Sequence, residues 1–123
     1  MASTVHNIAR YSVQILNQKT GVRRGSIIIH LYNDKDDNCG IALFQDYHAD
    51  MGEPPEADTK GGRVTAHYDI SFFQPFIDIL RTEDELYWKY HLVQMGRNQE
   101  VTDVSLDTKK EIIGEFFTRA TSG

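Results

Sequence analysis

Hydrophobic and polar residues alternate along six segments of the chain, and this period of two predicts six β-strands. The segments are residues 5–16, 26–32, 40–45, 63–70, 86–95 and 100–106. β-Branched residues in the second segment, SIIIHLY, strengthen the prediction there. Polar, glycine-containing stretches separate several of these segments, which is typical of strands that follow one another as antiparallel hairpins.

Residues 71–81 show the spacing of a helix instead. The apolar side of this helix consists of Phe73, Phe76, Ile77 and Leu80. Ser71 and Gln74 have the spacing of a capping box, and Pro75 is acceptable only because it falls in the first turn. A second capping pair, Thr108 and Glu111, predicts a short C-terminal helix. Its apolar residues are Ile112, Ile113, Phe116 and Phe117.

The resulting order, four strands, a helix, two strands and a helix, predicts a mainly β (α+β) fold. We expect an antiparallel six-stranded barrel or sandwich with one helix packed on it and a short C-terminal helix. A parallel, doubly wound sheet would need helices between most of its strands. Residues 46–62, which are rich in proline, glycine and carboxylates, predict a long surface loop. The 123 residues suit a single domain, 1–123.

Composition narrows the classes of function. The formal net charge of -5 and the sequence pI of about 5.4 disfavour binding to nucleic acid or to an anionic membrane. Cys39 is the only cysteine, which excludes an intrachain disulfide. The sequence contains no secretory leader pattern and no run of about 20 apolar residues. These features predict a cytoplasmic protein.

The five histidines are the first candidates for a functional site, but each strand histidine is isolated within its segment. His67 shares the polar face of its strand with Asp69, and His91 lies with Tyr87 on another. We expect His67 and Asp69 to form a surface pair and not a catalytic dyad, because no third group in the sequence orients the imidazole. The candidate ligand-binding residues are His67, Asp69, His91, Tyr87 and His30.

Other motifs carry less chemistry. The loop DKDDNCG begins with the alternating oxygen ligands of a calcium site, but Cys39 replaces the required glycine and Gln45 replaces the final glutamate. Cys39 has no basic neighbour in sequence to activate it. The stretch GGR at 61–63 reads as the entry to a strand and not as a phosphate-binding loop. We therefore predict no metal, no cofactor and no catalytic residues.

Periodicity leaves a second apolar face unexplained. Its residues are Tyr32, Phe44, Tyr87, Val93 and Met95. This surplus indicates either a closed barrel with a second apolar cluster or a surface that meets a partner. We predict a non-enzymatic binding or self-associating module, present as a homodimer, whose further protein or small-molecule partner is unknown. The alternative is a small-molecule-binding protein or small enzyme with a pocket at the barrel mouth, using His67, Asp69 and His91.

Overall fold

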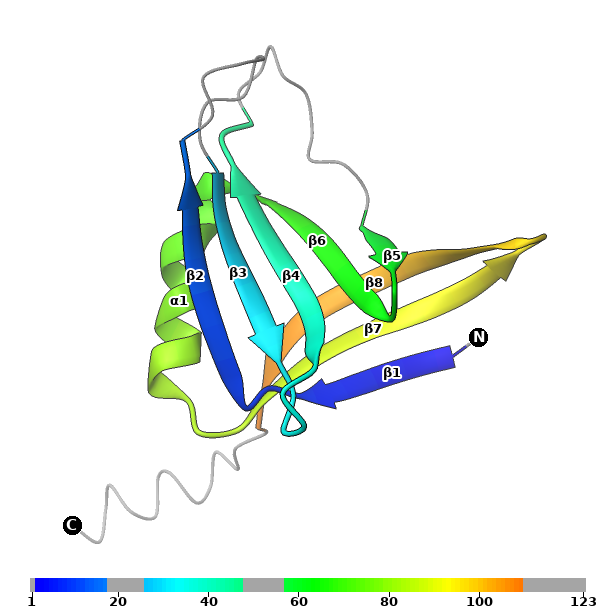
Figure 1. Ribbon diagram of the computed structural model, residues 1–123, viewed down its shortest axis with the longest axis horizontal. Coiled ribbons are helices and arrows are strands. Elements are labelled where there is room, and N and C mark those ends of the chain that lie inside the picture. Colours follow the sequence, from blue (N-terminus) through cyan, green and yellow to red (C-terminus); the bar gives the residue numbers. More distant parts are fainter. Residues whose placement is uncertain (1, 18–25, 48–56, 110–123) are drawn as a thin grey trace, which may run out of the picture.

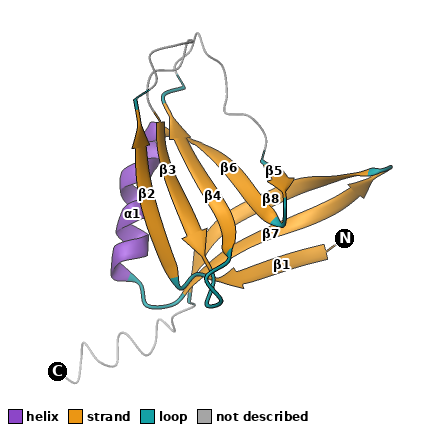
Figure 2. Ribbon diagram, viewed as in Figure 1, coloured by secondary structure: helices purple, strands orange, loops and turns teal. Residues whose placement is uncertain are grey.

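The computed structural model describes residues 2–17, 26–47 and 57–109. Within these residues the chain is mainly β, with two sheets and one α-helix (Figures 1 and 2). The three-stranded sheet has the order β1 (Ala2–Asn7), β7 (Leu86–Met95), β8 (Asn98–Thr108). The five-stranded sheet has the order β2 (Arg10–Leu16), β3 (Ser26–Tyr32), β4 (Asn38–Gln45), β6 (Arg63–Asp69), β5 (Asp58–Lys60).

The segment predicted as one strand, residues 5–16, is two strands that belong to different sheets. β1 pairs with β7 and β2 pairs with β3. The chain changes sheet at two consecutive residues: the Ile8 amide donates to the Leu86 carbonyl (2.9 Å), and the Ala9 amide donates to the Tyr32 carbonyl (2.8 Å). Both backbone amides still find a partner at the crossover, so the break between the two strands leaves neither donor unpaired.

The expectation of a purely antiparallel sheet is wrong at one pair, because β4 and β6 run parallel. The two strands are joined through residues 46–62, which are long enough for the crossover of a dozen or more residues that a parallel pair requires. Within that predicted loop lies β5, a three-residue strand that forms a tight hairpin with β6. A strand of three residues is too short to show an alternating pattern, so the sequence did not predict it. The prediction of strands at 86–95 and near 100–106 is confirmed.

The predicted helix is confirmed as a 3-10 turn, η1 (Ile70–Phe72), followed by α1 (Phe73–Thr82). α1 covers one face of the five-stranded sheet and lies behind it in Figure 1. Phe76, Ile77 and Leu80 are buried, as the pattern predicted. The capping box is wrong: the Asp69 carboxylate accepts from the amide and hydroxyl of Ser71 (3.0 and 2.6 Å), while Gln74 bonds to Asp78.

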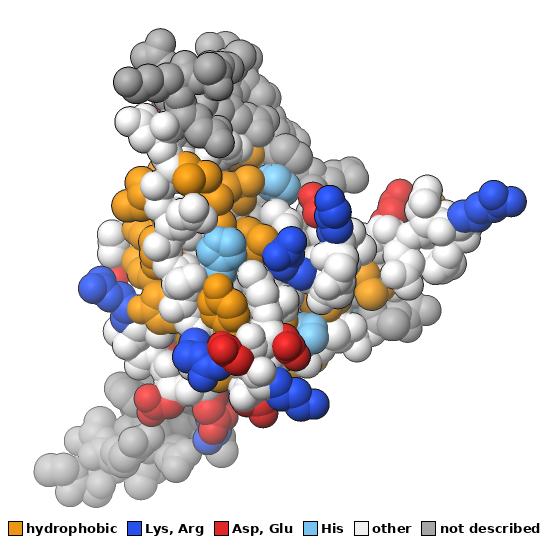
Figure 3. Space-filling model, viewed as in Figure 1, with side chains coloured by type: hydrophobic (Ala, Val, Ile, Leu, Met, Phe, Trp, Pro, Cys, Tyr) orange, Lys and Arg blue, Asp and Glu red, His pale blue; other side chains and the backbone are white. Residues whose placement is uncertain are grey.

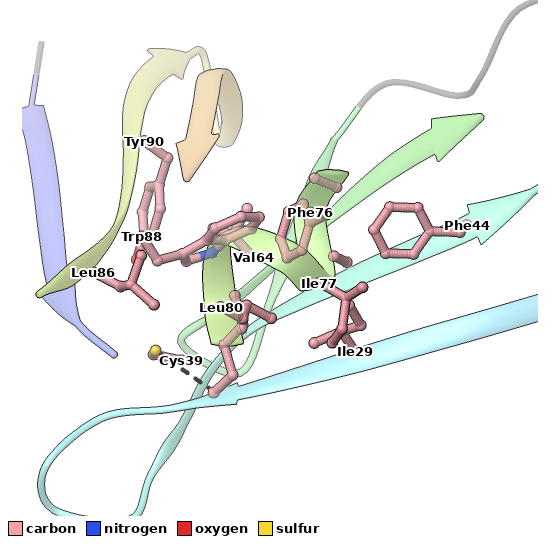
Figure 4. Close-up of a cluster of buried hydrophobic side chains, with 13 residues drawn as sticks. Ile29, Cys39, Phe44, Val64, Phe76, Ile77, Leu80, Leu86, Trp88 and Tyr90 are labelled. Carbon is pink, nitrogen blue, oxygen red and sulfur yellow. Dashed lines mark hydrogen bonds between the residues drawn. The ribbon is translucent and has the colours of Figure 1, made fainter. Parts of the chain in front are cut away.

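The core lies between α1 and the two sheets (Figure 4). Its largest fully buried side chains are Trp88 of β7 and Phe44 of β4. Phe76 of α1 meets both rings edge to face, with centroids 5.3 Å from Phe44 and 6.4 Å from Trp88. The helix therefore joins the two sheets through one aromatic side chain.

The placement of Phe44 on an exposed second face is thus wrong, because its register puts it beside Ile27 and Tyr68 on the helix-covered face. Met95 of the same predicted face is 52% exposed, as expected. Tyr32, Tyr87 and Val93 are half-buried. The excess of apolar residues on that face is consequently smaller than the sequence suggested.

The two sheets do not close into a barrel. No ladder joins them among the described residues, so β2 and β5 are the edges of one sheet and β1 and β8 the edges of the other. The predicted C-terminal helix, with Ile112, Ile113, Phe116 and Phe117, lies outside the described residues. In the part of the chain that the structure describes, the one α-helix is too short to span a membrane.

Candidate functional site

Of the predicted site residues, His67 lines a cleft of about 390 Å³ between β6 and β8. Ala66, His67 and Tyr68 form one side of it, and residues 100–104 of β8 form the other. The cleft exists because β5 pairs with β6 only over Arg63–Thr65. Beyond Thr65, the described residues supply no strand on that side of β6, and the next wall is the edge of the other sheet.

His67 is held within this wall and is not a surface residue. Its side chain is 13% exposed, and Nε2 lies 3.8 Å from the Oδ2 atom of Asp58 on β5. Nδ1 is buried and has no hydrogen-bond partner among the described residues. The expected surface pair with Asp69 is therefore wrong, because Asp58 from the neighbouring strand is the carboxylate that His67 approaches.

The opposite wall has an irregular backbone at Asp103. The β7–β8 ladder shifts register between Lys89 and His91, and Asp103 adopts a positive φ of 52° within the bulge. Left-handed backbone at a residue other than glycine is uncommon. The bulge directs the Asp103 carboxylate to within 4.0 Å of His91 Nδ1. The cleft thus has His67 on one side and, through Asp103, an indirect connection to His91 on the other.

Tyr68 connects the cleft to the core. Its ring stacks on Phe44 with centroids 5.4 Å apart and also meets Phe76 and Phe72. Burial raises the pKa of Tyr68 to about 12, because the phenolate would lose its hydration. The Tyr68 side chain is therefore a neutral phenol near pH 7 and not a base.

The other predicted site residues are not brought to this cleft. Asp69 caps η1 and also accepts from the amide of Tyr47 (3.0 Å). Tyr87 donates to Glu85 (3.1 Å), and this hydrogen bond, followed by the charge of Glu85, raises the pKa of Tyr87. His30 contacts Gln14 and Asn38 on the uncovered face of the five-stranded sheet. These three residues have structural contacts that account for their positions.

Sequence reasoning missed the carboxylates that accompany the two histidines. Asp58 lay in a segment interpreted as loop, and no pattern in the sequence signals the bulge that turns Asp103 toward His91. It also missed His6, whose Nε2 atom lies 3.0 Å from the Tyr90 hydroxyl. That contact joins β1 to β7 across a pairing of residues far apart in the chain, which periodicity cannot detect.

The calcium-like loop is a turn. The Oδ1 atom of Asn33 accepts from the amides of Lys35 and Asp37 (both 3.0 Å), and Asp36 pairs with Arg10. Such Asx geometry accounts for the Asp and Asn residues without a metal ion. Among the described residues, no group of three or more His, Cys, Asp or Glu side chains is arranged to hold a metal.

Cys39 is buried, and its thiol lies 3.6 Å from the Leu31 carbonyl. Desolvation raises the pKa of Cys39, which disfavours the nucleophilic thiolate.

Comparison with known proteins found no family model, no curated protein and no solved structure that matches this chain.

Proposed function

We propose that this chain is a non-enzymatic binding module that self-associates as a homodimer through the edge strand β2. The observation that carries the proposal is an unprotected, partly apolar edge. β2 pairs with β3 on one side only, and no described strand occupies its other side. An edge of this kind presents a row of backbone donors and acceptors to a second strand.

The edge lacks the features that usually prevent such pairing. The strand sequence is RYSVQIL, which contains no proline and no lysine. The ladder with β3 is continuous from Arg10 to Leu16, without a bulge. The one charged residue, Arg10, is at the start of the strand and pairs with Asp36. Charges, prolines and bulges are the common protections of an edge strand, and the middle of β2 has none.

Two apolar side chains of β2 are left exposed by the core of the monomer. Val13 and Ile15 lie opposite Ile29 and Ile27, on the face that packs against α1. Ile29 is fully buried, whereas Val13 is 43% and Ile15 74% exposed. The apolar face of the sheet thus continues past the point where the monomer covers it. Burying an isoleucine side chain completely contributes about 1.5–3 kcal/mol, which favours an added strand.

β2 is also complementary to itself in an antiparallel arrangement centred on Val13. That register places Val13 against its own copy and Ile15 against Tyr11 of the second chain, so these three apolar residues stay on one face. Arg10 meets Leu16, which avoids a pair of like charges. A two-fold axis through the strand centre is the closed symmetry that such a pair requires. One seven-residue strand per chain is a small interface, so we expect a weak, reversible dimer.

Sedimentation velocity over a range of protein concentrations tests the proposal. Wild type should show a monomer–dimer equilibrium, and Ile15→Lys should remain monomeric because the charge would be buried at the joint. Gln14→Lys is the matched control: Gln14 is exposed on the same strand but on the other face. Its lysine stays in water, so dimerisation should persist. A monomeric wild type at high micromolar concentration would end the proposal.

A second candidate function, small-molecule binding, is supported by the β6–β8 cleft. It brings His67 together with the carboxylates of Glu100 and Asp103 in a space of about 390 Å³. Native mass spectrometry of the purified protein tests this function. A retained small molecule that is lost in His67→Leu would favour it, whereas an empty cleft together with a concentration-dependent dimer would favour self-association.

A further inference from the structure

A second cleft, of about 670 Å³, opens between three elements at the other end of the β5–β6 hairpin. Its walls are the hairpin tip, the loop that joins β3 to β4, and His6 of β1. Figure 3 views the face that carries the hairpin and β1, and there Lys and Arg side chains lie close to histidine and carboxylate side chains. All lining residues belong to the described ranges, so the cleft is formed without any other segment.

The hairpin wall is cationic. Lys60 and Arg63 are opposite each other at the end of the β5–β6 ladder, and both line the cleft. Neither pairs with a carboxylate of residues 2–17, 26–47 or 57–109. Between them, Gly61 and Gly62 have φ values of 62° and 78°, as a two-residue hairpin turn demands. The amides of both glycines fall outside the ladder register, so this wall presents donors as well as charge.

The loop wall carries an unpaired negative charge. Asn33 shapes the loop through its bonds to the amides of Lys35 and Asp37, and Arg10 neutralises Asp36. Asp37 lines the cleft and has no cationic partner within 4 Å in the described part of the chain. Opposite charges thus border one cleft without forming an ion pair across it.

The remaining side is polar. The His6 ring has its Nε2 atom 3.0 Å from the Tyr90 hydroxyl, and Cys39 contributes a buried thiol. Because burial raises the pKa of Cys39, no thiolate competes with an anion for Lys60 and Arg63. The charge pattern of the cleft is therefore positive at the hairpin and negative at the loop.

We propose that this cleft binds a small zwitterion, with its anionic group at Lys60, Arg63 and the Gly61–Gly62 turn and its amino group at Asp37. A single molecule with both charges would supply the ion pairs that the protein leaves unmade. An ω-amino acid is the simplest ligand of this class. A simple anion or a simple amine would satisfy only one wall and should bind more weakly.

Amide chemical shifts of the full-length ¹⁵N-labelled protein at low ionic strength test the site, since screening by salt weakens exposed charge pairs. The probes are 4-aminobutyrate, butyrate and butylamine, which share one chain length and differ in their charged ends. We expect 4-aminobutyrate to shift the amides of Gly61, Gly62 and Asp37 and to bind about tenfold more tightly than either single-ended probe, the scale of one charge-assisted contact.

Two variants assign the ends. Arg63→Gln should weaken 4-aminobutyrate about tenfold while leaving butylamine unchanged, and Asp37→Asn should weaken it without affecting butyrate. Controls are Arg97→Gln in the exposed β7–β8 turn and Asp34→Asn in the same loop as Asp37, neither of which lines the cleft. Each spectrum also reports whether the variant is folded.

Equal binding of butyrate and 4-aminobutyrate would overturn the proposal, because the amino end would then contribute nothing. Absence of shifts at the hairpin and loop, or full binding by Arg63→Gln, would overturn it as well. These outcomes are independent of the dimer experiment, since β2 does not line this cleft.

Discussion

Gly40 of β4 lies against the indole ring of Trp88 of β7, so closely that a Cβ atom on Gly40 would be 2.3 Å from Trp88 Nε1. The two residues belong to different sheets, and both are buried. Trp88 is fully buried, so its ring cannot swing out into solvent without disturbing the core around it. This contact sets how closely the five-stranded sheet approaches the three-stranded one.

The first prediction is that Gly40→Ala destabilises the fold by about 1–3 kcal/mol, the usual cost of an overpacked core. Gly40 does not have a positive φ, so the added methyl group strains the contact and not the backbone. Urea unfolding followed by tryptophan fluorescence measures the loss. In a Trp88→Phe background the same substitution should cost less, because the smaller ring leaves room. Equal costs in both backgrounds would remove Trp88 as the cause.

Phe76→Ala should lower the free energy of unfolding by about 3 kcal/mol or more, because Phe76 fills the space between Phe44 and Trp88. Phe72→Ala is the matched aromatic control. Phe72 is 57% exposed in η1, so its truncation should cost less than about 1 kcal/mol. Similar losses in the two variants, measured by urea unfolding, would show that α1 does not pack as described.

Asp69→Ala should cost at least about 1 kcal/mol, since it removes the acceptor that begins η1 and holds the Tyr47 amide. Asp69→Asn keeps one oxygen and should fall between wild type and alanine. Asp78→Ala provides the comparison, because Asp78 is exposed and its side chain bonds to Gln74 of the same helix. A thermal melt of Asp69→Ala that matches Asp78→Ala would contradict the capping role.

Alkaline pH should destabilise the protein through Tyr68. Its pKa is raised from 10.0 to about 12 in the folded state, so between these values the folded protein retains a proton that the unfolded chain has lost. Stability is therefore complete below pH 10 and falls by up to about 1.4 kcal/mol per pH unit above it. Tyr68→Phe should flatten this part of the pH profile. Chemical unfolding of both proteins from pH 9 to 12 measures the difference.

Most strands and the helix were predictable because each buries one face, and burial imposes a period of two or 3.6 on the sequence. Phe76, Ile77 and Leu80 are examples, since the helical spacing alone identified them as core. Phe44 was misplaced because its strand lies between two neighbours and is apolar on both faces. A central strand of this kind has no polar face, so the sequence does not indicate which of its side chains point toward the core.

The candidate site was less predictable, because it depends on which strands are neighbours. His67 was found from its type, but its carboxylate comes from β5, a strand too short for any period to show. The neighbour of His91 arises from a bulge at Asp103, where the register shifts without a glycine or proline to mark it. Likewise, Lys60, Arg63 and Asp37 border one cleft only after the β3–β4 loop and the β5–β6 hairpin have been placed side by side.

The change of sheet at Ile8 and Ala9 also sets an order of events during synthesis. β2 pairs with β3, the next strand along the chain, so that pairing can form early, whereas β1 pairs with residues 87–92 of β7 and must wait until they are made. Until those residues have been synthesised, the β1 segment has no strand with which to pair. β1 is thus fixed later than the β2–β3 pair, although it precedes both strands in the sequence, and its pairing with β7 connects the two ends of the described chain within one sheet.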